Sequence, residues 1–159
     1  MVELDLHPSA VEGVADTRVA EWRRALEELN ADRGIRPRRP LKTPALHVLT
    51  RGELGFTLIL SAEGELPVHI DIRRRHLQPH FDSYREVIEH ILSPQGDAYG
   101  VEALDYGKKL VHDEAVELLV SMLRDHLEIE HVAAKRLFTL LFLLATDVPW
   151  GSARMDPRY

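Results

Sequence analysis

One short stretch of this chain concentrates the side chains that are able to do chemistry. Residues 105–114 read Asp-Tyr-Gly-Lys-Lys-Leu-Val-His-Asp-Glu, which places both signs of charge beside a histidine. Residues four apart share one face of a helix, so Asp105 is expected to contact Lys109. The same spacing brings Lys108 to His112. A histidine in such surroundings can exchange protons near neutral pH, and this stretch is therefore the first candidate for a functional site.

One hypothesis for this cluster is a small enzyme. His112 would act as the acid–base group, and Asp113 or Glu114 would orient its ring. Lys109 and Arg136 would hold an anionic substrate, Arg136 reaching in from a facing helix with its forked and permanently charged donor set.

The other hypothesis is a non-enzymatic binding or regulatory protein, and it is the one we favour. Surface ion pairs at a junction between two helices are common and contribute only about 0–1 kcal/mol each. The chain also has none of the glycine-rich phosphate loops, nucleophile elbows or H-E-x-x-H pairs that mark familiar enzymes. The ligand would be a protein partner or a small anion. A polar groove for it would be lined by Asp105, Lys108, Lys109, Asp113 and Arg136.

Metal and cofactor chemistry have little support in the sequence. The chain has no cysteine, which removes disulfides, thiolate zinc sites and iron–sulfur clusters. His76 and His80 are four residues apart, a spacing that suits a metal only on a helix, and Pro79 argues against a helix there. We expect neither a metal nor a cofactor.

Composition points to a globular protein that does not bind nucleic acid. The chain has 159 residues, a hydrophobic fraction of 45% and a formal charge of -6. An acidic protein is a poor ligand for phosphates, so the basic runs Arg36–Arg39 and Arg73–Arg75 are interpreted as solvated segments. If either run did bind DNA or RNA, the binding would depend strongly on salt.

The order of the expected elements indicates an α+β fold. An apolar stripe from Val19 to Leu29 predicts an N-terminal helix. Residues 45–72 follow with strand-like alternation, and helical patterns fill residues 81–91, 101–111, 118–124 and 131–145. A helix, then strands, then helices is a segregated order. We expect a single α+β domain over residues 1–148, with three to four helices packed on the sheet, and a flexible C-terminal tail over residues 149–159.

Three strands are expected in a row. Residues 45–50, 56–60 and 66–72 alternate apolar and polar side chains and are separated by short turn-like segments. Such links predict a three-stranded antiparallel meander. Pro67 lacks a backbone donor, which favours an edge position for the third strand. An exposed edge is able to pair with a second copy of the chain.

The helix over residues 131–145 is expected to be buried. Residues 137–145 are apolar nearly all the way round, so this helix must lie in a core or against a partner. The apolar run is far shorter than the ~20 residues that span a bilayer. Together with the free strand edge, it leads us to expect a cytoplasmic homodimer with no membrane segment.

Several motifs of the chain resemble those of one bacterial family. The likeness is carried by Val101–Lys109, by His112–Glu114 and by Ala134–Leu140, with weaker matches at Ser83–Ile88 and Leu46–Leu60. On these motifs the chain resembles the uncharacterised protein family (UPF) number 0262. The resemblance implies a compact cytoplasmic protein, and it implies no reaction because the family has none assigned.

Overall fold

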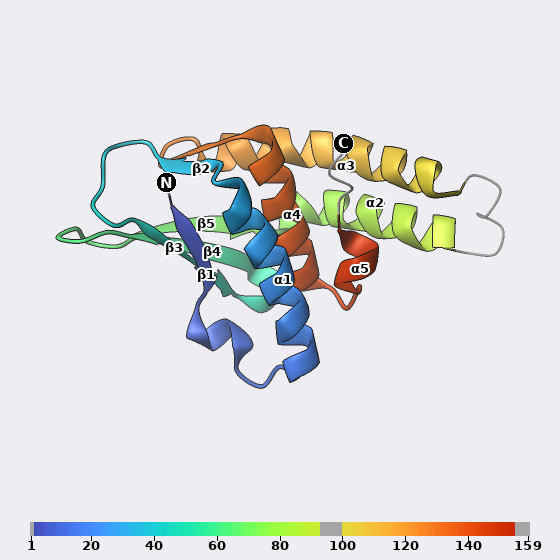
Figure 1. Cartoon of the computed structure of the whole chain (residues 1–159), viewed down its shortest axis with the longest axis horizontal. Helices are drawn as coiled ribbons and strands as arrows, with labels where there is room; N and C mark the ends of the chain where they lie inside the picture. Colours follow the sequence, from blue (N-terminus) through green and yellow to red (C-terminus); the bar gives the residue numbers. More distant parts are fainter. Residues whose placement is uncertain (1, 93–99, 155–159) are drawn as a thin grey trace.

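A mixed four-stranded sheet and a layer of helices make up the molecule (Figure 1). This computed structural model describes residues 2–92 and 100–154, and the side chains of residues 2–89 and 106–154. The sheet has the order β1-β3-β4-β5, with β1 parallel to β3 and the other pairs antiparallel. The strands are β1 (Glu3–Leu6), β3 (Ala45–Thr50), β4 (Gly55–Ser61) and β5 (Val68–Arg73). The α+β class predicted from the sequence is confirmed.

The meander over β3, β4 and β5 is present, but it is only part of the sheet. β1 pairs in parallel beside β3 and makes the sheet mixed, which the sequence did not reveal because β1 offers only Leu4 and Leu6 as inward-facing residues. β5 begins at Val68 and not at Leu66, whose side chain is 87% exposed. β5 is an edge strand, as Pro67 indicated.

A second, two-stranded sheet was also missed. β2 (Ile35–Pro37) pairs antiparallel with β6 (Leu127–Ile129), two segments expected to be a connector and a short link. Three-residue strands carry too little alternation to be recognised locally. Their pairing depends on Gly34, where an added Cβ would lie 2.7 Å from the Ala133 Cβ.

Five helices lie within the described residues. They are α1 (Asp16–Asp32), α2 (Arg74–Leu92), α3 (Gly100–Leu123), α4 (His131–Ala145) and the short α5 (Trp150–Ala153), with 3-10 turns at Pro8–Val11 and Gly52–Leu54. α3 is one helix where two were expected, because Val111, Ala115 and Leu119 continue a single buried stripe. α2 is helical through Pro79, contrary to expectation, and Leu77 and Phe81 bury its inner face on both sides of the proline.

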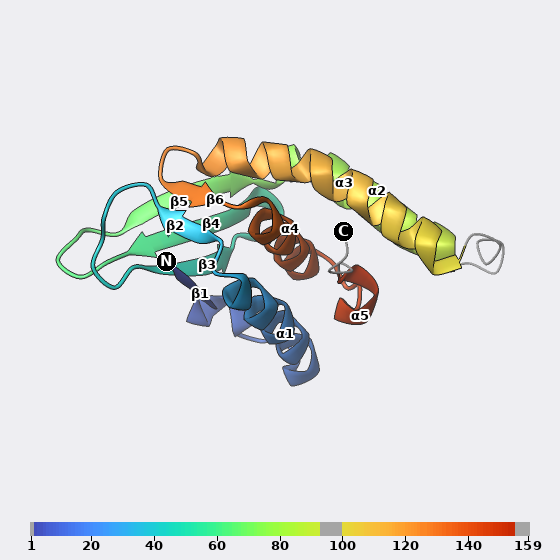
Figure 2. The same cartoon turned by 45° about the horizontal axis from the view of Figure 1, so that its top comes forward.

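The apolar helix α4 is buried as predicted, and it lies between α1 and α3 (Figure 2). Its end is anchored by Arg18 of α1, whose guanidinium donates to the carbonyl oxygens of Leu143 at 2.7 Å, Thr146 at 2.6 Å and Val148 at 2.7 Å. Helix C-terminal carbonyls have no partner within the helix and carry partial negative charge. Arg18 therefore satisfies the polar end of an otherwise apolar element.

Part of the segment assigned to a tail is helical. α5 places Ala153 in the core, and the Tyr84 hydroxyl of α2 donates a hydrogen bond to the Ala153 carbonyl. Residues 155–159 lie outside the described part of the chain. Among the described helices, none is both long and apolar enough to cross a bilayer.

The start of β4 requires a glycine, and this gives a test of the sheet. Gly55 has φ +131°, and an added Cβ would lie 2.1 Å from the Ile72 carbonyl oxygen of β5. Gly55→Ala is expected to lower the free energy of unfolding by about 3 kcal/mol or more, because backbone strain adds to the overlap. Gly52→Ala is the matched control, since Gly52 has φ +60° with no atom within 4 Å of an added Cβ. Its expected loss in urea denaturation is about 1 kcal/mol. Equal losses would contradict this account.

Candidate functional site

His112 lies in the middle of α3 and is fully buried. Its ring packs against Tyr84 of α2 at a centroid distance of 4.9 Å and against Phe138 of α4 at 5.4 Å. Its Nε2 lies 3.2 Å from the Thr139 Oγ1, and that hydroxyl donates to the Lys135 carbonyl. Since the single hydroxyl proton of Thr139 is used there, Nε2 of His112 is the donor. Thr139 therefore orients the ring, a role that had been expected of Asp113 or Glu114.

Burial makes His112 a neutral residue. Desolvation lowers the pKa of His112 to about 3, with further lowering by the nearby charges of Lys135 and Lys108. At neutral pH the ring therefore carries only its Nε2 proton and lacks the acidic second proton of an imidazolium. Its free Nδ1 is buried and has no hydrogen-bond partner among the described residues. These features are those of a packed core histidine.

Asp113, one residue further along α3, lies close to three basic side chains. Its carboxylate lies 3.3 Å from the Lys109 Nζ, 3.3 Å from the His131 Nε2 and 3.5 Å from the Lys135 Nζ. Partial burial raises the pKa of Asp113, but Lys109 and Lys135 outweigh this effect and hold it below its usual value. Asp113 is 37% exposed whereas Lys135 is 2% exposed, so the carboxylate lies at the surface above a buried ammonium group.

The remaining predicted residues do not converge on one groove. Lys108 is buried and donates to the Arg154 carbonyl oxygen at 2.9 Å. Arg136 points away from Asp113, and its guanidinium pairs with Asp32 of α1 at 2.5 Å and with Glu28 at 3.4 Å. Arg136 follows Lys135 directly, and successive helical residues point about 100° apart. The two cations therefore join α4 to different neighbours.

Glu114 and Asp105 are the other predicted site residues on α3. Glu114 is exposed on the outer side of α3. Asp105 lies in α3, but its side chain is outside the described residues, and the expected Asp105–Lys109 pair lies outside them too. Lys109 pairs with Asp113, its neighbour one turn later in the same helix.

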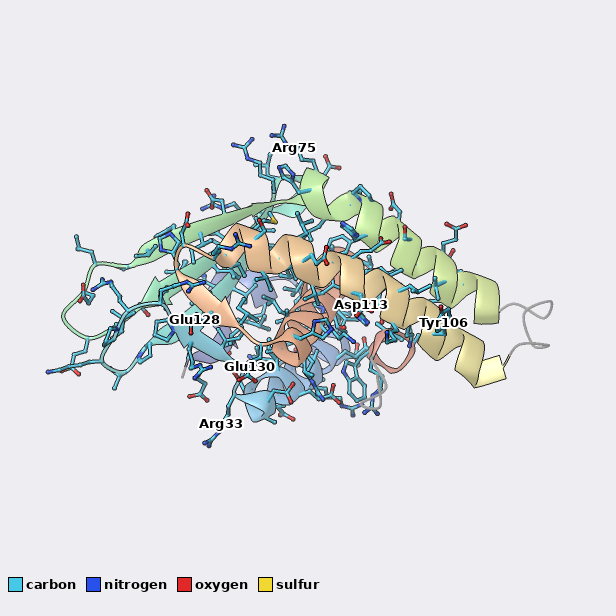
Figure 3. The ribbon with its side chains drawn as sticks, turned by 90° about the horizontal axis from the view of Figure 1, so that it is seen from above. Arg33, Arg75, Tyr106, Asp113, Glu128 and Glu130 are labelled. Carbon is cyan, nitrogen blue, oxygen red and sulfur yellow. The ribbon has the colours of Figure 1, made fainter. Side chains whose placement is uncertain are left out.

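The outer surface above the charge cluster carries apolar side chains. Tyr106, Leu110 and Val132 are 60%, 49% and 44% exposed. Tyr106 and Leu110 lie one turn apart on the face of α3 that also bears Asp113, and Figure 3 shows Tyr106 and Asp113 along this helix. Val132 lies one turn before Arg136 on α4, on the face that turns toward α1. We call the surface around Asp113 the α3–α4 patch: Tyr106, Lys109, Leu110, Asp113 and His131.

The metal candidates remain apart from any acidic partner set. His76 is exposed and His80 is half-buried, both on α2. Across the side chains described, no three histidine, aspartate or glutamate residues are gathered as metal ligands.

The basic run that begins within β2 is largely paired with glutamates. Arg38 contacts Glu128 of β6 at 3.1 Å, and Arg36 lies 3.7 Å from Glu130. Figure 3 shows both glutamates beside β6. In the second run, Arg74 donates to Gln78 at 2.9 Å.

The structure contains a hollow of about 290 Å³ that the sequence did not predict. It is formed where the β2–β3 connection, the β4–β5 turn and the α3–β6 turn meet, three segments that are remote in the chain. No local pattern marks such a meeting point. Its lining residues are Pro37, Arg38, Arg39, Leu41, Leu60, Ala62, Glu65, Leu66, Val68, Asp125 and His126.

The neutral state of His112 predicts an acid-dependent loss of stability. As pH falls below about 6.5, this histidine binds a proton in the unfolded chain, while in the folded protein it stays neutral down to about pH 3. Acid therefore favours unfolding by up to about 1.4 kcal/mol per pH unit in this range.

His112→Phe lacks this contribution, so its stability relative to the wild type should improve steadily between pH 6.5 and 4.5 in urea titrations. Thr139→Val keeps the titrating ring and is the matched control, with an unchanged pH slope. A His112→Phe variant that follows the wild-type slope would show that the ring is hydrated.

Comparison with known proteins identifies a family for the helical half of the chain. Residues 73–147 match the model of the Uncharacterised protein family (UPF0262), a span that contains α2, α3 and α4. A UPF0262 protein of Methylobacterium radiotolerans is 43% identical over 44 residues, and this alignment covers 28% of each of the two chains. No solved structure matches significantly. Residues 73–147 of the chain are therefore similar to the UPF0262 family, and the resemblance inferred from the sequence motifs within this span is confirmed.

Proposed function

We propose that this protein is a non-enzymatic binding protein that pairs with a second copy of itself through the α3–α4 patch. The observation that carries the proposal is the pair of exposed apolar side chains, Tyr106 and Leu110, on the face of α3 that bears the charges at Asp113. Apolar residues gathered on one surface and mixed with polar groups are typical of protein interfaces.

The position of His112 supports a binding role over catalysis. The rival hypothesis needs this residue as an acid–base group that a substrate can reach. The ring is fully buried between Tyr84 and Phe138, and burial keeps it uncharged. Arg136, the expected substrate anchor, is engaged with Asp32 and Glu28. In this proposal His112 and the aromatic rings packed around it serve as a rigid support beneath the α3–α4 patch.

The charges of the α3–α4 patch suit a second copy as the partner. A two-fold interface brings the same surface of each subunit together, so each surface must complement itself. Lys109 and His131 lie on either side of the Asp113 carboxylate, which gives the patch both signs of charge. Rotation about an axis through the patch can place the cation of one copy against the carboxylate of the other. We expect such a dimer in a bacterial cytoplasm, the setting that the family resemblance implies.

Leu110→Glu is expected to break the dimer. The new carboxylate would be desolvated beside Asp113 of either copy, which weakens association by at least about tenfold. Light scattering after gel filtration at micromolar concentration should give twice the 18.2 kDa chain mass for the wild type and a single chain mass for the variant.

Leu54→Glu is the matched control, because Leu54 is 77% exposed in the turn at Gly52–Leu54, away from the patch. It should remain dimeric. A monomeric wild type, or a Leu110→Glu variant that stays dimeric, would refute the proposal. Circular dichroism checks that both variants keep their helix content.

A further inference from the structure

The hollow beside β2 has the composition of a ligand site. Leu41, Leu60 and Val68 contribute an apolar floor, and Leu60 belongs to the main core. Leu66 stands at its rim with a side chain that is 87% exposed. An exposed leucine beside an apolar floor is explained if a ligand covers both. The volume of 290 Å³ corresponds to that of about ten water molecules, which suits a small molecule.

The rim of the hollow already binds a carboxylate. Arg39 donates from Nη1 and Nη2 to the two carboxylate oxygens of Glu65, at 3.1 and 3.0 Å. This forked arrangement is the preferred geometry of an arginine–carboxylate pair. Both side chains are substantially exposed, so the pair is weak and can be exchanged for an equivalent one. Glu65 also lies in the β4–β5 turn, where a side chain is free to move aside.

Arg38 supplies a second guanidinium group at the same rim. The backbone N–H of Arg38 donates to the His126 carbonyl at 2.9 Å, its Nε donates to the Arg124 carbonyl at 2.6 Å, and its Nη1 contacts Glu128. The first contact holds the backbone, and the other two fix the direction of the side chain. Its Nη2 makes no hydrogen bond to any residue that the structure describes, so two N–H groups remain for a ligand.

We propose that this hollow binds a small carboxylic acid with an unbranched apolar tail. The tail lies on Leu41, Leu60 and Val68 and is covered by Leu66. The carboxylate takes the place of Glu65 on Arg39 and accepts a hydrogen bond from Arg38. The two arginines then face the ligand while Glu65 turns to water, and Glu128 stays paired with Arg38.

Titration calorimetry with octanoate tests this assignment on the full chain. Octanoate should bind, while octylamine and acetate should bind at least about tenfold more weakly, since the first reverses the charge and the second lacks the tail. Octylamine that binds as tightly as octanoate would overturn the proposal by showing apolar contact alone. The absence of octanoate binding at millimolar concentration would overturn it as well.

Variants separate the two arginine partners. Arg39→Gln should weaken octanoate binding by about tenfold or more, because a charge-assisted fork is lost. Glu65→Gln should strengthen binding several-fold, because the competing carboxylate is gone. If Glu65→Gln weakens binding as Arg39→Gln does, the ion pair supports the loops and the proposal fails.

Two further variants control for the place of binding. Ala62→Trp fills the hollow and should abolish octanoate binding without lowering the midpoint of thermal unfolding substantially, because Ala62 is half-buried at the surface. Leu54→Ala alters an exposed leucine elsewhere and should leave binding unchanged. Binding that survives Ala62→Trp, or that is lost in Leu54→Ala, would place the ligand outside this hollow. The result is independent of dimer formation, because the lining residues and the α3–α4 patch have no member in common.

Discussion

The burial of α4 is the constraint on which the rest of the molecule depends. A helix that is apolar on nearly every side cannot face water, and each large side chain removed from water contributes roughly 1.5–3 kcal/mol. α1, α2 and α3 supply the covering surfaces, through Trp22, Tyr84 and Leu119 among others. The backbone end of α4 still needs partners, and Arg18 provides them from α1. The order of the helices in space follows from this single requirement.

The charges around α4 determine how the helix is rotated within its surroundings. Lys135 and Arg136 are adjacent, so they point toward different neighbours, one to Asp113 on α3 and the other to Asp32 on α1. Rotating α4 by one residue would move Lys135 away from the Asp113 carboxylate. This is strongly unfavourable, because a buried ammonium group needs a counter-charge. The apolar residues bury the helix, and the two cations specify one orientation. This division of roles explains why a charged cluster can be conspicuous in the sequence and structural in the fold.

The two surfaces with binding potential are both consequences of that packing. The α3–α4 patch exists because α3 runs unbroken past the start of α4, which brings His131 of α4 to the face of α3 that bears Leu110 and Asp113. The hollow exists because the segments that follow β2 and precede β6 meet the β4–β5 turn and leave space between them. In each case a rigid support lies beneath side chains that are free to contact a partner.

The sequence by itself determined the α+β class, the strands β3 and β4, the edge position of β5 and the burial of α4, because each rests on periodicity or on the chemistry of one residue. Local pattern failed for β1, β2 and β6, since strands of three or four residues are stabilised by a distant partner. It also failed for the candidate site. Spacing along α3 correctly placed Lys108, His112 and Asp113 close together. It does not predict which side of the helix is exposed to solvent. Only the tertiary structure decided that His112 is sealed beneath Tyr84 and Phe138 and that Arg136 turns to α1, because burial and ion pairing depend on which helices are neighbours.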